Sequence, residues 1–405
     1  MKTVLFVCYG SGHVRMVLPV ARALAASGWA RPLVLGLTTA APLVREAGLP
    51  LLQFKDVVQP GDEAALAMGR RLLADLSGRV SDPEVSAAYL GLSFADLVSA
   101  QGEAAAHARY HEFGRQAFFP LGVLRRILDQ VKPALVVATN SPRAERAAIV
   151  AAGERGIPAV CLVDLFAIDE VQWIADADYG QRVCVLNSAV KDFLVLSGRR
   201  PDQVVVTGNS AFDVLMTASA PGAVAALRAA QGWLGSKLIL WPAQTEPARH
   251  PFDGRPGDPS LPGRVLQQLI DLVLAQPDWV LCVRPRAGEE PPPLPVHPRI
   301  RLTGQDWPLP ALLHAVDLVV TLSSTVGLEG HLVGARVLQV LGSVFDHAMP
   351  MKAYGIADEA VGLDDLSPAL LRCLALPRRP PSAQKLATER VLQVLQPYIS
   401  SAPSA

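Results

Sequence analysis

Charge is scarce in this sequence. Charged residues make up 18% of the 405 residues, below the quarter that is usual for soluble domains. The 37 lysines and arginines balance 37 aspartates and glutamates, so the formal net charge is zero. Because affinity for a nucleic-acid backbone comes mainly from cations that neutralise phosphates, we expect no nucleic-acid partner. Half of the residues are hydrophobic, which argues against a disordered chain and predicts a large globular protein.

Cysteines and long apolar runs are also few. The five cysteines are Cys8, Cys161, Cys184, Cys282 and Cys373. Their odd number and wide spacing argue against a disulfide framework or a zinc cluster and predict small buried side chains. No apolar run reaches the length of about 18 residues that a membrane span needs. Because MKTVLFVCYG leads into a glycine turn instead of a signal-peptide cleavage site, we expect a cytoplasmic protein, with association at the inner membrane face left open.

Strand and helix patterns alternate from the N-terminus. Residues 3–9 form a short β-rich apolar run, a glycine turn follows, and apolar residues then recur with helical spacing until Gly28. Residues 31–38 predict the next strand. This β-α-β order predicts a parallel sheet covered by helices. Residues 60–130 are helical in composition and lack clear strands, which predicts a helical insertion.

Strand patterns resume after the insertion and form two series, separated by an Ala-rich helical stretch near 214–235. Further strands are expected at 134–139, 159–164, 182–187 and 203–208 in the first series, and at 237–242, 279–285, 299–304, 317–322 and 336–341 in the second. Two such series predict an α/β protein with two doubly wound, Rossmann-like domains that face a cleft. We place the domains at 1–218 and 219–385, with a C-terminal helix and tail at 386–405.

Ligands of parallel sheets bind beyond the carboxyl ends of the strands, so the residues that follow each strand are candidates for function. Gly10, Ser11 and Gly12 follow the first strand and open a helix. Glycines allow close backbone approach, and a helix N-terminus attracts a phosphate or a sugar oxyanion. The helix dipole disfavours the charged imidazolium of His13, which keeps a neutral base available. A tight turn in which His13 merely caps the helix explains the same residues.

The segment SSTVGLEG follows a strand of the second series. Ser323, Ser324 and Thr325 offer hydroxyls and backbone donors at a helix start, which suits a phosphate. Glu329 is a candidate acceptor for two ribose hydroxyls. Helix capping also accounts for the hydroxyls. A capping box, however, needs its glutamate three residues after the first serine, where this chain has Val326, so we favour ribose binding for Glu329.

Three more strand ends of the second series carry candidates. Arg284 and Arg286 suit a diphosphate or a carboxylate, although solvated surface arginines show the same pattern. Gln305, in the loop TGQDWP, is a candidate for reading a nucleobase. Asp346 and His347 are candidates for binding sugar hydroxyls. Each feature is weak alone, and their agreement on one cleft carries the prediction.

Two patterns have the spacing of metal ligands. Asp176 and Asp178 have the DxD form, but they precede a strand instead of following one, so an acidic loop is the simpler explanation. His107 and His111 have helical i, i+4 spacing, but the acidic residue of the zinc-protease motif is missing. We therefore expect no metal site.

Three segments together resemble the GT-B glycosyltransferases, the superfamily that also contains the UDP-N-acetylglucosamine 2-epimerases. They are GSGHVRMVLPVARALAASG, VVVTGNSAFDVL and DLVVTLSSTVGLEGHLVGARVLQV, in this order along the chain. The first is similar to the GxGH turn of nucleotide-sugar hydrolases and lipid-linked glycosyltransferases of this fold. The second is similar to the interdomain TGN segment of the epimerases, which implies a place for Asn209 at the donor. The third matches the serine and the ribose-binding glutamate of the epimerase nucleotide site, which implies donor binding by Ser323 and Glu329.

Departures from the epimerase pattern bear on the reaction. Where the epimerases carry a catalytic aspartate after the strand ALVVAT, this chain has Thr139, Asn140 and Ser141, and WPAQTEPARH stands in place of their HRREN segment. VRPR resembles an element of bacterial capsule and CMP-sugar transferases, with Arg286 in place of their histidine. A CMP-linked donor therefore stays open beside a UDP-linked one.

The resemblance implies a metal-independent glycosyltransferase, acting in bacterial surface-polysaccharide biosynthesis. It uses no cofactor, because the nucleotide sugar is a substrate, and a UDP-linked donor is favoured over a CMP-linked one. The C-terminal domain is expected to bind the donor, and the N-terminal domain a glycan, lipid-linked or other acceptor. His13 is the first candidate base and Asp164 the second. The alternatives are a nucleotide-sugar hydrolase or 2-epimerase-like isomerase, and a non-catalytic nucleotide-sugar-binding protein.

Overall fold

The computed structural model describes most of the chain. The described residues are 1–10, 12–74, 82–217, 221–251, 253–286, 289–304, 307–380 and 386–400. The chain divides into two compact units, unit 1 (Met1–Ala211 with Lys385–Ala405) and unit 2 (Phe212–Gln384). The boundary expected after residue 218 lies a few residues beyond the one after Ala211, and the C-terminal helix that was expected to stand apart belongs to unit 1.

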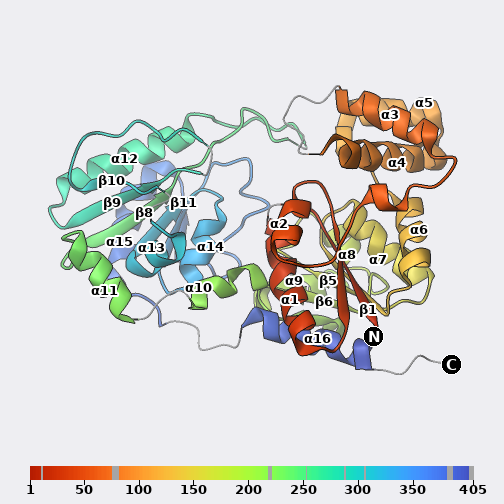
Figure 1. Ribbon diagram of the computed structural model, residues 1–405. Helices are drawn as coiled ribbons and strands as arrows, with labels where there is room; N and C mark the ends of the chain where they lie inside the picture. The colour runs from red at the N-terminus through yellow and green to blue at the C-terminus, as the bar shows by residue number, and fades with distance from the viewer. Residues whose placement is uncertain are drawn as a thin grey trace. The chain divides into compact units, whose positions relative to one another are not determined.

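Unit 1 contains a seven-stranded parallel sheet. Its strands are β1 (Thr3–Cys8), β2 (Arg31–Gly36), β3 (Leu51–Leu52), β4 (Leu135–Thr139), β5 (Ala159–Leu162), β6 (Arg182–Val185) and β7 (Val204–Val206). Their spatial order is β3-β2-β1-β4-β5-β6-β7. In the register of the central strands, Val4 of β1 lies opposite Pro32 of β2 and Leu135 of β4. The central strands are continuous apolar runs because helices cover both faces of the sheet (Figure 1).

The helices of unit 1 connect these strands and add the expected insertion. They are α1 (Gly12–Ser27), α2 (Ala40–Glu46), α3 (Glu63–Ala74), α4 (Pro83–Gln101), α5 (Glu103–Phe113), α6 (Leu121–Val131), α7 (Ala144–Glu154), α8 (Val171–Ile174), α9 (Ser188–Leu196) and α16 (Ala387–Ser400). The helices α3, α4 and α5 form the insertion. A Cβ on Gly69 of α3 would lie 2.0 Å from the carbonyl oxygen of Ala87 in α4. Glycine at this position therefore lets the two helices pack closely against each other.

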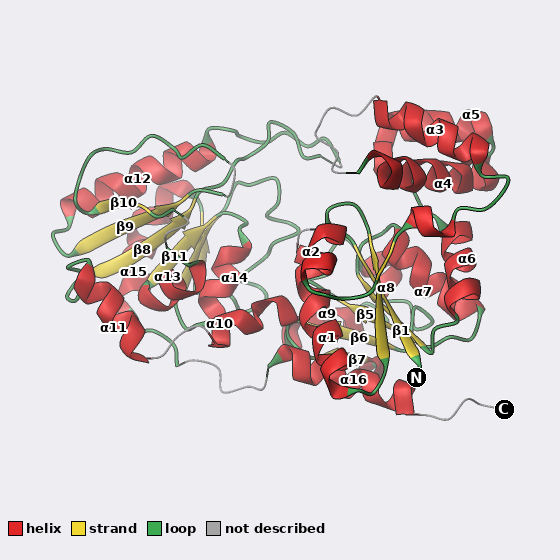
Figure 2. Cartoon of the chain, in the orientation of Figure 1, coloured by secondary structure: helices red, strands yellow, loops and turns green. Residues whose placement is uncertain are grey.

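Unit 2 contains a six-stranded parallel sheet. Its strands are β8 (Lys237–Pro242), β9 (Trp279–Arg284), β10 (Ile300–Leu302), β11 (Leu318–Thr321), β12 (Arg336–Val340) and β13 (Glu359–Val361), in the spatial order β10-β9-β8-β11-β12-β13. Its helices are α10 (Asp213–Thr217), α11 (Pro221–Ala230), α12 (Leu261–Ala275), α13 (Leu309–Ala315), α14 (Thr325–Leu332) and α15 (Leu366–Ala375). Helices flank the strands on both faces of this sheet too (Figure 2).

Short 3₁₀ helices complete the secondary structure. They are η1 (Phe54–Val57), η2 (Gly114–Ala117), η3 (Pro201–Gln203), η4 (Ser210–Phe212) and η5 (Leu363–Asp365). No described helix is long and apolar enough to cross a membrane.

Each unit has its own apolar core. In unit 1, Val391 and Leu395 of α16 join the same buried cluster as Val17 of α1 and Phe6 of β1. In unit 2, the strands pack against α12 and α15.

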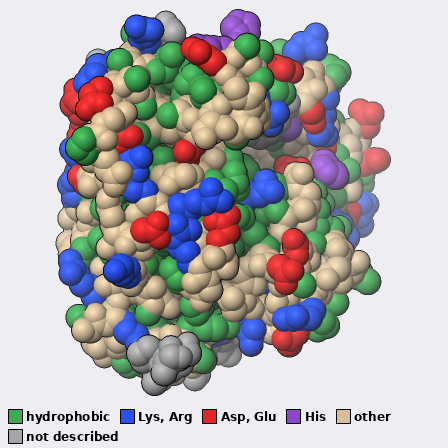
Figure 3. All heavy atoms as spheres, turned by 90° about the vertical axis from the view of Figure 1, so that its right-hand side faces the viewer, with side chains coloured by type: hydrophobic (Ala, Val, Ile, Leu, Met, Phe, Trp, Pro, Cys, Tyr) green, Lys and Arg blue, Asp and Glu red, His purple; other side chains and the backbone are tan. Residues whose placement is uncertain are grey.

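Acidic and basic side chains are interspersed on the face of the molecule that Figure 3 shows, in keeping with the neutral composition.

The two sheets confirm the predicted fold class of two Rossmann-like, doubly wound α/β domains. In unit 1 the chain builds outward from β1 through β2 to β3 and then returns to the other side of β1 with β4. Unit 2 repeats this at β8, which lies between β9 and β11. In open parallel sheets ligands bind where the strand order reverses, beyond the carboxyl ends of the two strands concerned. The residues that follow β1 and β4, and β8 and β11, are therefore the first candidates for ligand binding.

Candidate functional site

At the reversal point of unit 1, the glycine turn after β1 meets the connections after β2 and β4. The Arg143 guanidinium lies over the Tyr9 ring, 4.4 Å from its centroid. A Cβ on Gly10 would lie 1.7 Å from the Thr39 hydroxyl oxygen, so the neighbouring connection itself requires glycine there. A Cβ on Gly12 would meet nothing within 4 Å. Of the two glycines, Gly12 therefore borders open space. Ser11 lies outside the described residues.

His13 lies in the first turn of α1, beside Asp164. The Nε2 atom of His13 is 3.8 Å from Oδ2 of Asp164, and the two side chains are 22% and 25% exposed. The Nδ1 atom of His13 is buried and has no hydrogen-bond partner among the described residues. Thus the two candidate bases, which follow β1 and β5, lie at one place in unit 1.

Two asparagines hold Asp164 in position. The Asn140 Nδ2 donates to Oδ1 of Asp164 at 3.0 Å, and the Asp164 amide donates to Oδ1 of Asn140 at 3.1 Å. The Asn209 Nδ2 donates to the Asp164 carbonyl at 2.8 Å, while its Oδ1 accepts from the Ala211 amide at 2.9 Å. Asn209, which the resemblance places at the donor, lies in unit 1 and supports the His13–Asp164 pair.

Glu170 is a third ionisable group at this place, and the sequence did not single it out. It precedes the short helix α8 and is partly buried. Burial raises the pKa of Glu170 to about 7; the Asp164 carboxylate adds to this rise, and the Asn140 side chain opposes it. A carboxyl group that titrates near neutrality beside Asp164 is suited to proton transfer.

At the reversal point of unit 2, Gln244 joins the connections that follow β8 and β11. Its Oε1 accepts from the Thr321 hydroxyl and from the Leu322 amide, both at 3.0 Å. Its Nε2 donates to the Ser323 hydroxyl at 3.3 Å. Gln244 lies within WPAQTEPARH, the segment that stands in place of the HRREN segment of the epimerases. It orients the serine that opens the predicted phosphate site.

The start of α14 follows directly. Ser324 is the N-cap residue, and its Oγ accepts from the Val326 amide at 3.3 Å, so the capping role recognised in the sequence is present. The Thr325 hydroxyl donates to Oε1 of Glu329 at 3.4 Å, one turn further along the helix. Glu329 interacts electrostatically with Arg284. Burial lowers the pKa of Arg284, and the Glu329 charge opposes this shift without cancelling it. The predicted phosphate and ribose residues are thus neighbours.

The two arginines after β9 differ in their surroundings. The Nη1 of Arg284 donates to the carbonyls of Gly304 and Trp307, at 3.2 and 2.7 Å. These bonds anchor the loop that contains Gln305, a residue outside the described ones. Arg286 is exposed and pairs with Glu289 at 3.2 Å. Arg284 is therefore the arginine that the fold holds in a fixed place.

Asp346 and His347 lie in the loop after β12. The Oδ2 of Asp346 accepts from the Gly342 amide at 2.6 Å, whereas its Oδ1 is buried without a hydrogen-bond partner among the described residues. Burial raises the pKa of Asp346. His347 is exposed.

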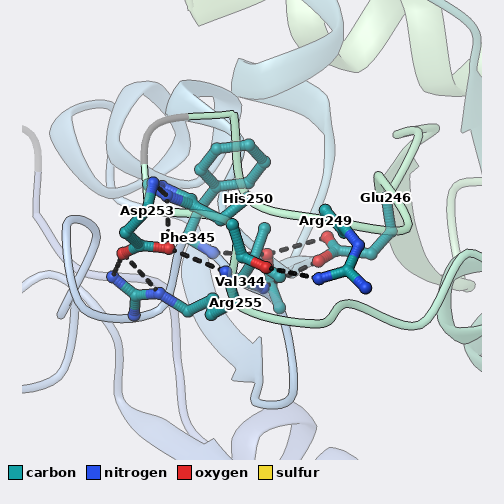
Figure 4. A network of polar contacts seen from close by, with 9 residues as sticks. Glu246, Arg249, His250, Asp253, Arg255, Val344 and Phe345 are labelled. Atoms are coloured by element: carbon teal, nitrogen blue, oxygen red, sulfur yellow. Dashed lines mark hydrogen bonds and ion pairs between the residues drawn. The ribbon is translucent and has the colours of Figure 1, made fainter. Parts of the chain in front are cut away.

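A buried carboxylate fixes this loop to the connection after β8, as Figure 4 shows. Glu246 is 6% exposed, and its two oxygens accept from the Ser343 hydroxyl at 2.8 Å and from the Val344 amide at 2.7 Å. Nearby, His250 pairs with Asp253 at 3.0 Å. Two loops from different parts of the sequence thereby form one border of the unit 2 site.

The patterns with metal-ligand spacing have structural explanations. Oδ1 of Asp176 accepts from the amide of Asp178 at 2.9 Å, which closes a local turn. His107 packs against Phe94, with ring centroids 4.9 Å apart. Within the described parts of the chain, no group of three or more His, Cys, Asp or Glu side chains is arranged to hold a metal ion.

Comparison with known proteins reveals likeness in fold. No protein-family model and no curated protein matches the sequence. A co-structure of Staphylococcus aureus MnaA with UDP aligns with 100% of this chain and 99% of its own, at 14% identity and a TM-score of 0.57. The UDP-GlcNAc 2-epimerase of Neisseria meningitidis, bound to UDP-GlcNAc, aligns over 97% and 99%, at 14% identity and a TM-score of 0.57.

A third structure, the glycotransferase of kitacinnamycin, aligns with 98% of this chain and 94% of its own, at 15% identity and a TM-score of 0.53. The chain therefore has the two-domain fold that UDP-GlcNAc 2-epimerases share with GT-B glycosyltransferases.

Proposed function

We propose that this protein is a nucleotide-sugar-dependent glycosyltransferase, with a UDP-linked donor favoured over a CMP-linked one. The observation that carries the proposal is the arrangement at the reversal point of unit 2. There, Gln244 orients Ser323, the hydroxyls of Ser324 and Thr325 open α14, and Glu329 follows one turn later. A helix N-terminus lined with hydroxyls suits phosphate, and a carboxylate one turn away suits the vicinal hydroxyls of a ribose.

The remaining donor contacts follow from the same border of unit 2. Arg284 commits its Nη1 to two loop carbonyls. Its positive charge, beside the N-terminus of α14, would stabilise the diphosphate. The loop that Glu246 fixes carries Asp346, which we assign to the sugar together with His347. UDP and UDP-GlcNAc are the ligands of two similar structures and support the choice of uridine.

The chemistry requires a nucleophile on the acceptor and a base beside it. The acceptor oxygen forms a bond to the anomeric carbon, the bond from that carbon to the diphosphate breaks, and the electron pair leaves with the nucleotide. The acceptor proton passes to His13. Asn140 holds the carboxylate of Asp164 and Asn209 holds its main-chain carbonyl. The carboxylate lies 3.8 Å from Nε2 of His13 and would stabilise the imidazolium that forms.

The ribose assignment is tested by measuring the binding of UDP and 2′-deoxy-UDP to the full chain. Glu329→Gln should weaken UDP binding by at least about tenfold, because hydrogen bonds to a charged acceptor contribute about 1.5–3 kcal/mol. The variant should also lose the preference of the wild type for UDP over 2′-deoxy-UDP. Glu290→Gln, at an exposed position of unit 2, is the matched control and should bind like the wild type. Unchanged UDP affinity in Glu329→Gln contradicts the assignment.

The nucleotide class and the reaction are tested separately. A panel of UDP, CMP, GDP, TDP and their sugars should raise the unfolding temperature most for the cognate donor, because a ligand of the folded state stabilises it. A transferase should release the nucleotide only slowly until an acceptor is present. Fast release without acceptor identifies a hydrolase or an epimerase, and no response to any nucleotide refutes the proposal.

A further inference from the structure

Unit 1 contains a cavity of about 260 Å³ that the proposed donor site does not use. The cavity lies where the connection after β2 and the start of α2 meet the insertion helices. These are α3 and α4, which lie side by side in Figure 1. Its lining is more apolar than polar. The apolar walls include Pro42 of α2, Leu73 of α3 and Leu90 of α4.

Two hydroxyls in this lining have unmet hydrogen-bonding capacity. The hydroxyls of Tyr89 and Thr38 are buried and have no hydrogen-bond partner among the described residues. Tyr89 is only 3% exposed. Buried polar groups in native proteins are nearly always paired, so such groups beside a cavity indicate a bound molecule that completes the pairing.

The backbone at Thr38 adds an independent sign. Its φ is 46°, in the left-handed region that residues other than glycine rarely adopt. Strained backbone of this kind persists where the surroundings hold it, and it gathers at ligand-binding sites. Thr38 and Thr39 both line the cavity. Thr39 lies beside the glycine turn, because its hydroxyl occupies the place that a Gly10 side chain would take. The cavity therefore adjoins the turn that leads to His13.

The charges in the lining favour an anionic group. Asp82 accepts from the Val85 amide at 3.1 Å and pairs with Lys55 at 3.5 Å, so its charge is already balanced. Arg45 donates to Gln53 at 3.0 Å. Arg115 lines the cavity and is exposed, and its guanidinium has no hydrogen bond or ion pair with the described residues. Gln53 is neutral, so neither arginine of the lining is paired with a carboxylate among the described residues, and the Arg115 guanidinium also keeps its donors for a ligand.

We propose that this cavity binds the acceptor, and that the acceptor is a small hydroxylated molecule with an apolar body and one anionic group. The cavity is smaller than the usual ligand pocket of about 300–1,000 Å³, so it excludes a whole nucleotide sugar. Apolar walls hold the body, Tyr89 and Thr38 meet polar atoms, and Arg115 pairs with the anion. The acceptor role rests on the proposed function; the binding chemistry of the cavity stands on its own residues.

The test uses 4-hydroxybenzoate and its neutral analogue 4-hydroxybenzamide as probes of the full chain. The wild type should bind the benzoate more tightly than the amide. Ser86→Phe places a ring in the cavity from α4 and should abolish binding of both probes. Ser99→Phe makes the same change at an exposed position of the same helix and should leave binding unchanged. UDP binding should be the same in all of these proteins.

A second, milder pair of variants guards against misfolding. Arg115→Gln should weaken benzoate binding by roughly tenfold and leave the amide unaffected, because only the anion pairs with the guanidinium. Arg71→Gln, at an exposed position of α3, is the control and should bind both probes as the wild type does. Benzoate binding that survives both Ser86→Phe and Arg115→Gln, or its absence in the wild type, overturns the proposal.

Transfer separates an acceptor from an effector. With the donor that stabilises the protein most, 4-hydroxybenzoate should be converted to its glycoside, detected by mass. Binding without a glycoside assigns the cavity to an effector and overturns the acceptor role. If the wild type binds benzoate but does not bind UDP, the proposed function is refuted. The binding chemistry of the cavity then still stands.

Discussion

The pKa of Glu170 leads to a prediction about stability and pH. Burial and the Asp164 charge raise this pKa from 4.5 to about 7 in the folded chain. Between these two pH values the folded protein holds a proton that the unfolded chain has released. The free energy of unfolding therefore falls as the pH rises through this range, and the contribution is lost above pH 7.

The size of the effect follows from the shift. Each pKa unit corresponds to about 1.4 kcal/mol, so the full shift corresponds to about 3 kcal/mol. Because Glu170 keeps partial contact with solvent, we expect about 2–3 kcal/mol. The variant Glu170→Gln resembles the protonated side chain at every pH. It should match the stability of the wild type near pH 4.5 and exceed it by this amount at pH 8.

Urea denaturation followed by circular dichroism at the two pH values measures the difference. Glu112→Gln removes an exposed carboxylate of α5 that does not act on Glu170 and is the control, with the same effect expected at both pH values. If the stability difference between Glu170→Gln and the wild type does not change between pH 4.5 and pH 8, Glu170 does not titrate as argued. The rate of glycosyl transfer by the variant then tells whether the proton is also used in catalysis.

Three further substitutions test how the loops are held. Gln244→Leu leaves the buried amide of Leu322 without an acceptor, and should lower the free energy of unfolding by about 2–4 kcal/mol and weaken UDP binding in calorimetry; unchanged UDP affinity would separate this loop from the donor site. Glu246→Ala removes two charge-assisted hydrogen bonds and should lower the free energy of unfolding by about 3–5 kcal/mol, measured by urea titration with tryptophan fluorescence. A loss below about 1 kcal/mol would contradict the role inferred for Glu246. Gly10→Ala should lower the melting temperature through its clash with Thr39, and Thr39→Ala in the same chain should restore most of the loss.

The main elements of the fold could be predicted because their signals are local. Long apolar strands such as β8 and β9 were placed to within a residue, since burial on both faces makes the whole run hydrophobic. The strands β3 and β13 were missed. They span two and three residues at the edges of their sheets, and their side chains are only partly buried. Such strands are defined by pairing with a neighbour, which no local pattern reports.

The candidate site was predictable only where it follows the strand ends. The serines before α14 could be found because they start a helix after a buried strand. The approach of His13 to Asp164 joins the ends of two separate strands, and the raised pKa of Glu170 depends on burial that only the folded chain provides. Gln244 and Glu246 were overlooked because their partners lie far along the chain, in the loops after β11 and β12.

The packing of α16 on α1 has a consequence for synthesis on the ribosome. The core of unit 1 includes Val391, Leu395 and Ile399, and the Lys2 ammonium donates to the Ile399 carbonyl at 2.8 Å. Unit 2 lies wholly within the intervening sequence, so it leaves the ribosome before these residues do. The half of the protein that is translated first is thus the last to complete its core. Until α16 arrives, the nascent chain exposes the part of α1 that α16 covers in the folded protein.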